Sequence, residues 1–231
     1  EKKWEVMMPN SFKDGAPVTP KDYIDLGLSI TPCNGKEPVA KGWQEKGLQI
    51  EVWNQKYKDH NIGLMGKDNT NVDIDHLAVK KFIAIYLKNC GAIYGRMSNP
   101  MSHYLFKGEL PYKKYTMPAE LAHYMKDYPH GVTLLEIRSG KDKQSIVPGS
   151  KIDGEDVVWD KFAGINPYQG NLEEDISIVV LSAALSIIYP AKGFRDDYCT
   201  AIAGVLSQHT DWGEDNINNF IYNLAVRSGD D

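Results

Sequence analysis

The chain has 231 residues, 42% of them hydrophobic, and a net charge of −5, so it can bury a core large enough for one large domain or two small ones. No apolar run approaches the roughly 20 residues of a membrane span, and residues 1–10 lack the apolar stretch of a signal peptide. The 3 cysteines are widely separated and form no CxxC pair, so neither a disulfide framework nor a structural zinc site is indicated. We therefore expect a cytoplasmic protein with reduced thiols and no membrane partner.

Between Pro20 and Trp159, short apolar or alternating segments are separated by Gly, Pro and Asn, a pattern typical of strands joined by turns. Helices are predicted over Pro20–Leu26 and over residues 77–89, and the second has its apolar residues mostly on one side. A Gly- and Lys-containing hairpin is predicted after the strand that carries Glu136. The predicted strands, in chain order, are LGLSITPC, NIGLMG, NVDID, AIYGRMS, SHYLF, TLLEIRS, QSIVPGS and DVVW. This mixture predicts the α+β class.

From Ile176 onward the hydrophobic period is that of helices throughout. Three helices are predicted, over residues 176–190, 194–210 and 214–229, and INPYQGNLEED at 165–175 is the predicted linker. The charge changes at the same place. Residues 167–231 contain ten Asp or Glu against three Lys or Arg, a net −7, which leaves residues 1–166 at +2. We therefore predict one domain over residues 1–166, and a linker with a small helical bundle over residues 167–231.

The segment VDID at residues 72–75 holds two carboxylates side by side. Successive side chains of a strand point to opposite faces, so its two apolar residues would face a core while Asp73 and Asp75 project together from the other face. Glu136 lies between apolar residues of a later predicted strand. Three carboxylates on one sheet repel one another unless a divalent cation lies between them, and hard oxygen ligands are what Mg²⁺ and Mn²⁺ prefer.

Ser102 and His103 open another predicted strand, after a turn that contains proline. Magnesium and manganese usually complete their coordination shell with substrate phosphates, and a pair of such ions can stabilise both the attacking and the leaving oxygen of a nucleotidyl transfer. His103, Arg138 and the nearby lysines would then hold the phosphates. Spacing alone leaves two interpretations open. One is a metal site, and the other is a chance DxD pair with a structural histidine and an ion pair between Glu136 and Arg138.

Three motifs follow one another along the chain: VDID at 72–75, RMSNPMSHYLF at 96–106 and LLEIRSGKDKQSIVPGSKIDGEDVVW at 134–159. In this order they resemble the motifs of the archaeo-eukaryotic primase superfamily, specifically the bifunctional primase-polymerase domains of plasmids, phages and mobile elements. The third motif is the most specific of them. The run DYIDLGLSITPCNGKEPVAKGWQ at 22–44 is similar to the opening of such domains, so the likeness covers roughly residues 20–160.

The resemblance implies an RRM-like catalytic sheet with flanking helices, followed by a small all-helical domain. It implies that Asp73, Asp75 and Glu136 bind two Mg²⁺ or Mn²⁺ ions, and that His103 contacts the triphosphate of an incoming nucleotide. The family has one residue between its Ser and His, whereas here the two are adjacent. Further candidates for nucleotide binding, on position and charge, are Ser102, Arg96, Arg138, Lys141 and Lys143.

The C-terminal segment over residues 193–231 is similar to the helical unit that precedes a helicase domain in many such proteins. The sequence contains no Gly-x-x-x-x-Gly-Lys-Ser/Thr loop, so a downstream helicase domain is expected outside this chain. The resemblance thus implies a replication protein of a mobile element or phage, in a bacterial, archaeal or phage-infected cell.

The activity implied is that of a DNA primase and polymerase. Such an enzyme builds primers from nucleoside triphosphates by metal-dependent transfer, and extends them on a single-stranded DNA template. Two other classes stay open. The first is a metal-dependent nuclease, which would use the same carboxylates. The second is a non-catalytic module that binds single strands through exposed aromatic residues. The candidates for such residues on the predicted strands are Tyr94, Tyr104 and Phe106.

Overall fold

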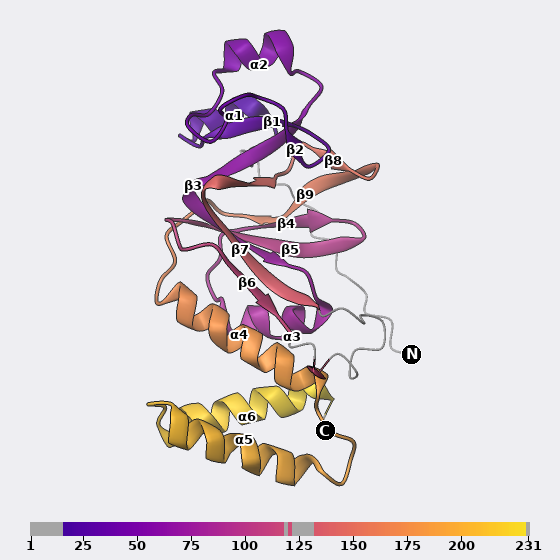
Figure 1. Cartoon of the computed structure of the whole chain (residues 1–231), viewed down its shortest axis with the longest axis vertical. Helices are drawn as coiled ribbons and strands as arrows, with labels where there is room; N and C mark the ends of the chain where they lie inside the picture. The colour runs from indigo at the N-terminus through magenta and orange to yellow at the C-terminus, as the bar shows by residue number, and fades with distance from the viewer. Residues whose placement is uncertain (1–15, 118–119, 122–131, 230–231) are drawn as a thin grey trace. The chain divides into compact units, whose positions relative to one another are not determined.

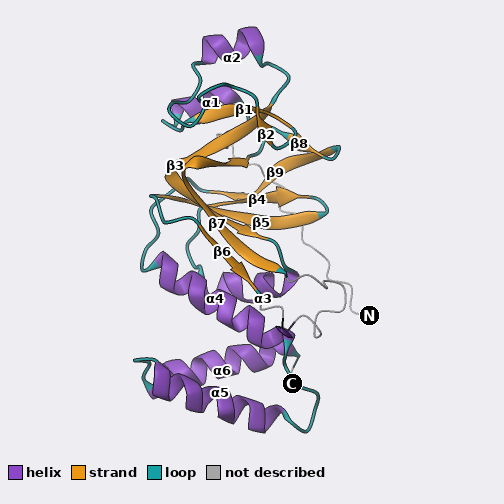
Figure 2. Ribbon diagram, viewed as in Figure 1, coloured by secondary structure: helices purple, strands orange, loops and turns teal. Residues whose placement is uncertain are grey.

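The structure is a computed structural model that describes residues 16–117, 120–121 and 132–229 (Figure 1). Within these ranges it combines strands of a curled, largely antiparallel sheet with six helices, which confirms the predicted α+β class (Figure 2). None of the helices in the described ranges is long and apolar enough to cross a membrane. The prediction that there is no signal peptide concerns residues 1–10, which lie outside the described residues.

The chain divides by contacts into two compact units. The first comprises residues 1–73, 89–113 and 137–169, and the second comprises residues 74–88, 114–136 and 170–231. The division falls inside two long strands, β3 (Asn61–Ile74) and β7 (Thr133–Ile146). It does not coincide with the boundary expected between residues 166 and 167, which stays a prediction about domains. The RRM-like topology and the separate all-helical C-terminal domain also stay predictions.

The sheet of the first unit is antiparallel along the path β2-β1-β3-β5-β4-β9-β8, and β7 pairs with β3 outside this path. The remaining strands on the path are β1 (Ile30–Asn34), β2 (Glu37–Pro38), β4 (Ala92–Arg96), β5 (Asn99–Lys107), β8 (Lys151–Ile152) and β9 (Glu155–Phe162). Two short helices, α1 (Pro20–Asp25) and α2 (Ile50–Lys56), bury Tyr23 and Trp53 in the core of this unit. The buried Tyr23 hydroxyl donates to the Pro148 carbonyl at 2.9 Å, which ties α1 to the segment after β7.

The two long strands correct the sequence-based expectation. NIGLMG and NVDI, all but the last residue of the predicted NVDID, lie in the single strand β3, although exposed Lys67 and Asp68 interrupt its buried pattern. TLLEIRS and the first three residues of QSIVPGS lie in the single strand β7, so the hairpin predicted between them is wrong. The physical reason lies at Gly140, whose positive φ of 100° bends the strand without reversing it. Beside it, the buried Ser139 hydroxyl donates to the Asn69 carbonyl of β3 at 3.0 Å, which holds β7 against β3.

The second unit is mostly helical. It contains α3 (Leu77–Tyr86), α4 (Leu172–Ile187), α5 (Arg195–His209) and α6 (Glu214–Ser228), and α4 packs against α3 and α6. Strand β6 (Lys113–Thr116) pairs with β7. Helix α4 begins at Leu172, inside the predicted linker, because the Asn171 side chain accepts a hydrogen bond from the backbone of Glu174 and acidic residues fill the first turn. Residues 172–175 of the predicted linker therefore belong to α4.

A glycine substitution tests the turn that follows β7. Gly149 has φ 93°, and a Cβ placed on it would lie 1.9 Å from the Val18 carbonyl oxygen. Gly154 has φ 84°, but nothing lies within 4 Å of its Cβ position. We expect Gly154→Ala to lower the free energy of unfolding by about 1 kcal/mol through backbone strain alone, and Gly149→Ala to lower it by about 3 kcal/mol or more. Urea unfolding followed by tryptophan fluorescence measures both, and equal losses would contradict the close approach of Val18.

Candidate functional site

The site of the first unit is built around Asp73. This residue alternates with Val72 and Ile74, which are 0% and 2% exposed, so its side chain lies on the other face of β3. The carboxylate is partly buried, with 16% of the side chain exposed. In the register between β3 and β5, Asp73 pairs directly with His103. A partly desolvated carboxylate needs compensating partners, and the neighbouring strands provide them.

Two groups from two strands contact the two oxygens of this carboxylate. Nδ1 of His103, from β5, lies 3.3 Å from Oδ1 of Asp73. Nε of Arg138, from β7, lies 3.2 Å from Oδ2. The structure therefore brings together Asp73, His103 and Arg138, three of the residues that the sequence singled out. The guanidinium of Arg138 forms an ion pair with this carboxylate.

The imidazole of His103 is half-buried, with 23% of the side chain exposed. Its ring stacks on that of Tyr94, with centroids 4.6 Å apart and planes 14° apart. Burial lowers the pKa of His103, the Asp73 carboxylate opposes this shift, and the positive charges of Arg138 and Lys36 add to the lowering. The charges around the ring therefore act on the pKa of His103 in both directions, and Nδ1 is placed to donate to Oδ1 of Asp73.

The other two predicted metal ligands belong to the second unit. Asp75 is exposed, one residue beyond the end of β3, and its backbone N–H donates to the Leu134 carbonyl at 3.2 Å. Glu136 is half-buried on β7, two residues before Arg138, and strand alternation puts both on one face of that strand. Within the described residues, no three His, Cys, Asp or Glu side chains are grouped closely enough to form a metal cluster. The ligand set therefore stays a prediction.

Two of the predicted nucleotide-binding residues lie outside the group around Asp73. Ser102 is 4% exposed and directly precedes His103, so strand alternation points the two side chains to opposite faces. Arg96 lies at the end of β4, where its guanidinium donates to the carboxylate of Asp153 at 3.1 Å, in the turn between β8 and β9. Its charge still contributes to lowering the pKa of His103.

The two predicted lysines lie in the exposed central part of β7. Nζ of Lys141 is 4.0 Å from a carboxylate oxygen of Glu45, and the two side chains are 72% and 77% exposed, respectively. Nζ of Lys143 is 3.3 Å from Asp142 and lies 4.2 Å from the ring centre of Tyr112. The exposed ion pair of Lys141 adds little to stability, so this lysine can rearrange around a phosphate at small cost. The side chain of Lys143 is only 30% exposed and would also have to leave the Tyr112 ring.

Three residues near His103 were missed as site residues by sequence reasoning: Asn71, Tyr94 and Lys36. Asn71 precedes Asp73 by two residues, and the alternation of a strand could have placed it on the same face. Lys36 stands in the turn between β1 and β2, next to Gln144, whose side-chain amide donates to its carbonyl at 2.7 Å. Only the strand register reveals that Tyr94 lies opposite His103.

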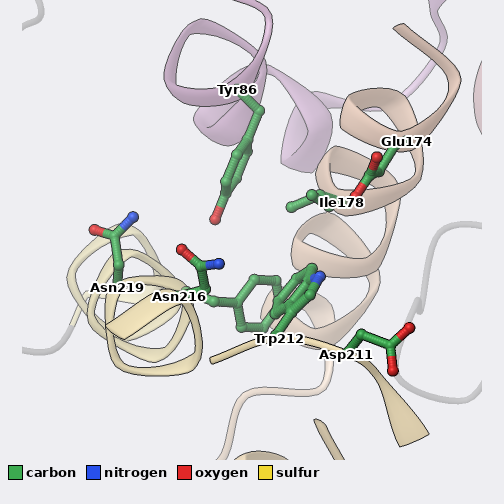
Figure 3. A pocket seen from close by; sticks show the side chains of 8 residues that line it. Tyr86, Glu174, Ile178, Asp211, Trp212, Asn216 and Asn219 are labelled. Atoms are coloured by element: carbon green, nitrogen blue, oxygen red, sulfur yellow. The ribbon is translucent and has the colours of Figure 1, made fainter. Parts of the chain in front are cut away.

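The second unit contains a hollow of about 420 Å³ (Figure 3). Its lining comes from α3, α4, α6 and the loop before α6, and consists of Tyr86, Glu174, Ile178, Asp211, Trp212, Asn216, Asn219 and Phe220. Two of these residues are carboxylates and none is a lysine, arginine or histidine. The hollow is therefore unsuited to bind a phosphate group, and the site around Asp73 remains the better candidate for nucleotide chemistry.

A double-mutant cycle tests the ion pair of Asp73 with Arg138. We expect Asp73→Ala and Arg138→Met each to lower the free energy of unfolding by about 1 kcal/mol, and the pair to show a coupling energy of about 0.5 to 1 kcal/mol, because both groups are partly buried. The exposed pair of Glu45 and Lys141, changed to Glu45→Ala and Lys141→Met, is the control and should show no measurable coupling. Thermal and urea unfolding measure both cycles, and equal coupling in the two would contradict the partly buried ion pair.

A search of curated proteins found no match to this chain. A family model described as bifunctional DNA primase/polymerase, N-terminal, matches residues 20–168, which is more than half of the chain. The matched region includes Asp73, His103 and Arg138, whose contacts form the site described above, together with Asp75 and Glu136. The match also agrees with the likeness expected for roughly residues 20–160. The chain belongs to the bifunctional DNA primase/polymerase N-terminal family.

Proposed function

We propose that the chain is a template-directed nucleotidyltransferase that makes and extends DNA primers in the replication of a mobile element or phage. The family supports primase and polymerase chemistry in general. The observation that carries the proposal for this chain is the contact of Asp73 with both His103 and Arg138. A carboxylate next to two groups able to hold phosphate suits a site where an anionic substrate meets a cation.

Asp73, Asp75 and Glu136 would hold two Mg²⁺ or Mn²⁺ ions. Their donor chemistry fits, because these cations prefer carboxylate oxygens and take the rest of their shell from phosphates and water. When bound, the cations would neutralise charge that develops at the α-phosphate and lower the pKa of the attacking 3′-hydroxyl. Arg138 already neutralises Asp73, so a cation that binds this carboxylate competes with the guanidinium.

Arg138 and His103 would hold the β- and γ-phosphates of the incoming nucleotide. A guanidinium presents a planar set of donors that matches phosphate oxygens, and the 3.2 Å contact places it beside Asp73. Arg96, Lys36, Lys141 and Lys143 supply further positive charge in the first unit, whereas Ser102 points to the other face of β5. No side chain need act as a nucleophile, because the primer hydroxyl attacks.

The proposed partners are single-stranded DNA, nucleoside triphosphates and a helicase domain outside this chain. One assay separates the proposal from its alternatives. The purified chain is incubated with single-stranded template, labelled nucleotides and Mg²⁺ or Mn²⁺, with and without a primer. We expect products in both reactions. A shortened template would instead identify a nuclease, and template binding without product would identify a binding module.

The three carboxylates have separate variants in this assay. We expect Asp73→Asn, Asp75→Asn and Glu136→Gln each to lower the rate of nucleotide incorporation by about 10²-fold or more, because loss of one ligand weakens charge stabilisation at the transferred phosphate by several kcal/mol. Asp68→Asn is the matched control, since Asp68 is exposed on the same strand and asparagine tolerates its positive φ of 64°. Normal incorporation by any of the three site variants would remove that residue from the ligand set.

His103 has a test of its own. If its ring contacts the triphosphate, His103→Ala should raise the KM for the nucleotide about tenfold, the loss expected for one hydrogen bond to a charged group. Affinity for a fluorescent single-stranded oligonucleotide, measured by anisotropy, should change by less than about twofold. A parallel loss of oligonucleotide affinity would instead assign His103 to the template.

A further inference from the structure

Tyr94 lies directly against His103 in the sheet. The two residues are paired in the register between β4 and β5, and Tyr94 is fully buried at 0% exposure. Its ring stacks on the imidazole on one side and meets Trp159 edge-on, with centroids 5.3 Å apart, on another. The imidazole therefore rests on an aromatic ring that cannot move independently of the core.

The hydroxyl of Tyr94 adds a polar contact on the same side. The side-chain amide of Asn71, which is 3% exposed, donates to this hydroxyl at 2.7 Å. The same amide nitrogen lies 3.4 Å from Nδ1 of His103. Asn71, two residues before Asp73 on β3, thus holds the tyrosine hydroxyl and packs next to the imidazole.

These contacts restrain a torsion that is otherwise loose. The χ2 angle of histidine is broad and roughly two-fold, so a contact between Asp73 and Nδ1 alone leaves the ring plane poorly defined. Stacking on Tyr94 sets the plane, the Nδ1–H that faces Asp73 donates to its Oδ1, and the Asn71 amide packs beside the same edge of the ring. The Nε2 nitrogen is then the one that is left to meet a ligand.

We propose that Tyr94 and Asn71 are positioning residues, which hold the His103 ring so that Nε2 meets the phosphate of the bound nucleotide. The inference rests on the proposed function, in which His103 contacts the triphosphate. It adds that the position of this contact depends on a buried hydroxyl and a buried amide that do not themselves touch the substrate.

The informative substitution is Tyr94→Phe, because it keeps the stacked ring and removes only the hydroxyl that Asn71 contacts. Tyr104→Phe is the matched control. Tyr104 is also buried, at 2% exposure, and it follows His103 on the opposite face of β5. Both variants lose one buried hydroxyl, but Tyr94→Phe also removes the partner of the buried Asn71 amide, so its melting temperature is expected to fall further. Function is therefore compared at a temperature at which thermal unfolding shows both variants to be fully folded.

Two readouts are taken on the whole chain at one pH. The first is the ring nitrogen shifts of His103 in ¹⁵N-labelled protein, identified by the signal that His103→Gln removes. The second is the KM for dATP with Mg²⁺ in primer extension. We expect Tyr94→Phe to shift the His103 signals and to raise KM about 3- to 10-fold with kcat within about twofold, as for loss of one net hydrogen bond, while Tyr104→Phe changes neither.

A second variant tests whether the two residues act together. Asn71→Ala should reproduce the effect of Tyr94→Phe, and the double variant should lose little more than either one, because both remove the same hydrogen bond. Unchanged His103 signals, or shifted signals with an unchanged KM, would overturn the inference. If the wild-type chain incorporates no nucleotide, the proposed function fails separately, and titration of the His103 signals with dATP and Mg²⁺ still decides whether Tyr94 and Asn71 govern binding at the ring.

Discussion

The ionised carboxylate of Asp73 is the constraint on which the site depends. Only 16% of its side chain is exposed, so water cannot fully solvate the charge and the surrounding strands must provide donors. Arg138 and His103 do so from β7 and β5, at 3.2 and 3.3 Å. Because the three residues come from three different strands, the ion pair forms only when the sheet has its native register, and folding itself assembles this part of the site.

The bend in β7 determines where the guanidinium lies. Ser139, which directly precedes Gly140, is 1% exposed, and its hydroxyl donates to the carbonyl of Asn69. A Cβ placed on Gly66 would lie 2.9 Å from the Gly140 carbonyl, so close packing of the two strands requires glycine there. Arg138 is the next residue before Ser139. The same backbone features that keep β7 continuous therefore hold Arg138 beside the carboxylate.

Local signals in the sequence were sufficient for some features and not for others. Helix α1 was predictable because proline stands at its first turn and Thr19 forms a capping box. Strands β3 and β7 were each divided wrongly, because Lys67 with Asp68, and Gly140 with its lysines, have the composition of turns, and only pairing between strands keeps them extended. Charge and spacing singled out Asp73, His103 and Arg138. Tyr94 was considered only as an exposed aromatic for binding single strands, whereas it is 0% exposed, and its place beside His103 could not be known before the register.

The acidity of the C-terminal part has a local explanation that bears on DNA binding. Acidic residues fill the first turns of α4, α5 and α6, where they interact favourably with the helix dipole. The same charges make residues 167–231 strongly negative, and carboxylates also line the hollow in the second unit. A phosphate backbone is repelled by such a surface. Under the proposed function, attraction for a template would therefore come from cations in residues 1–166, where exposed lysines such as Lys141 have only weak partners to give up.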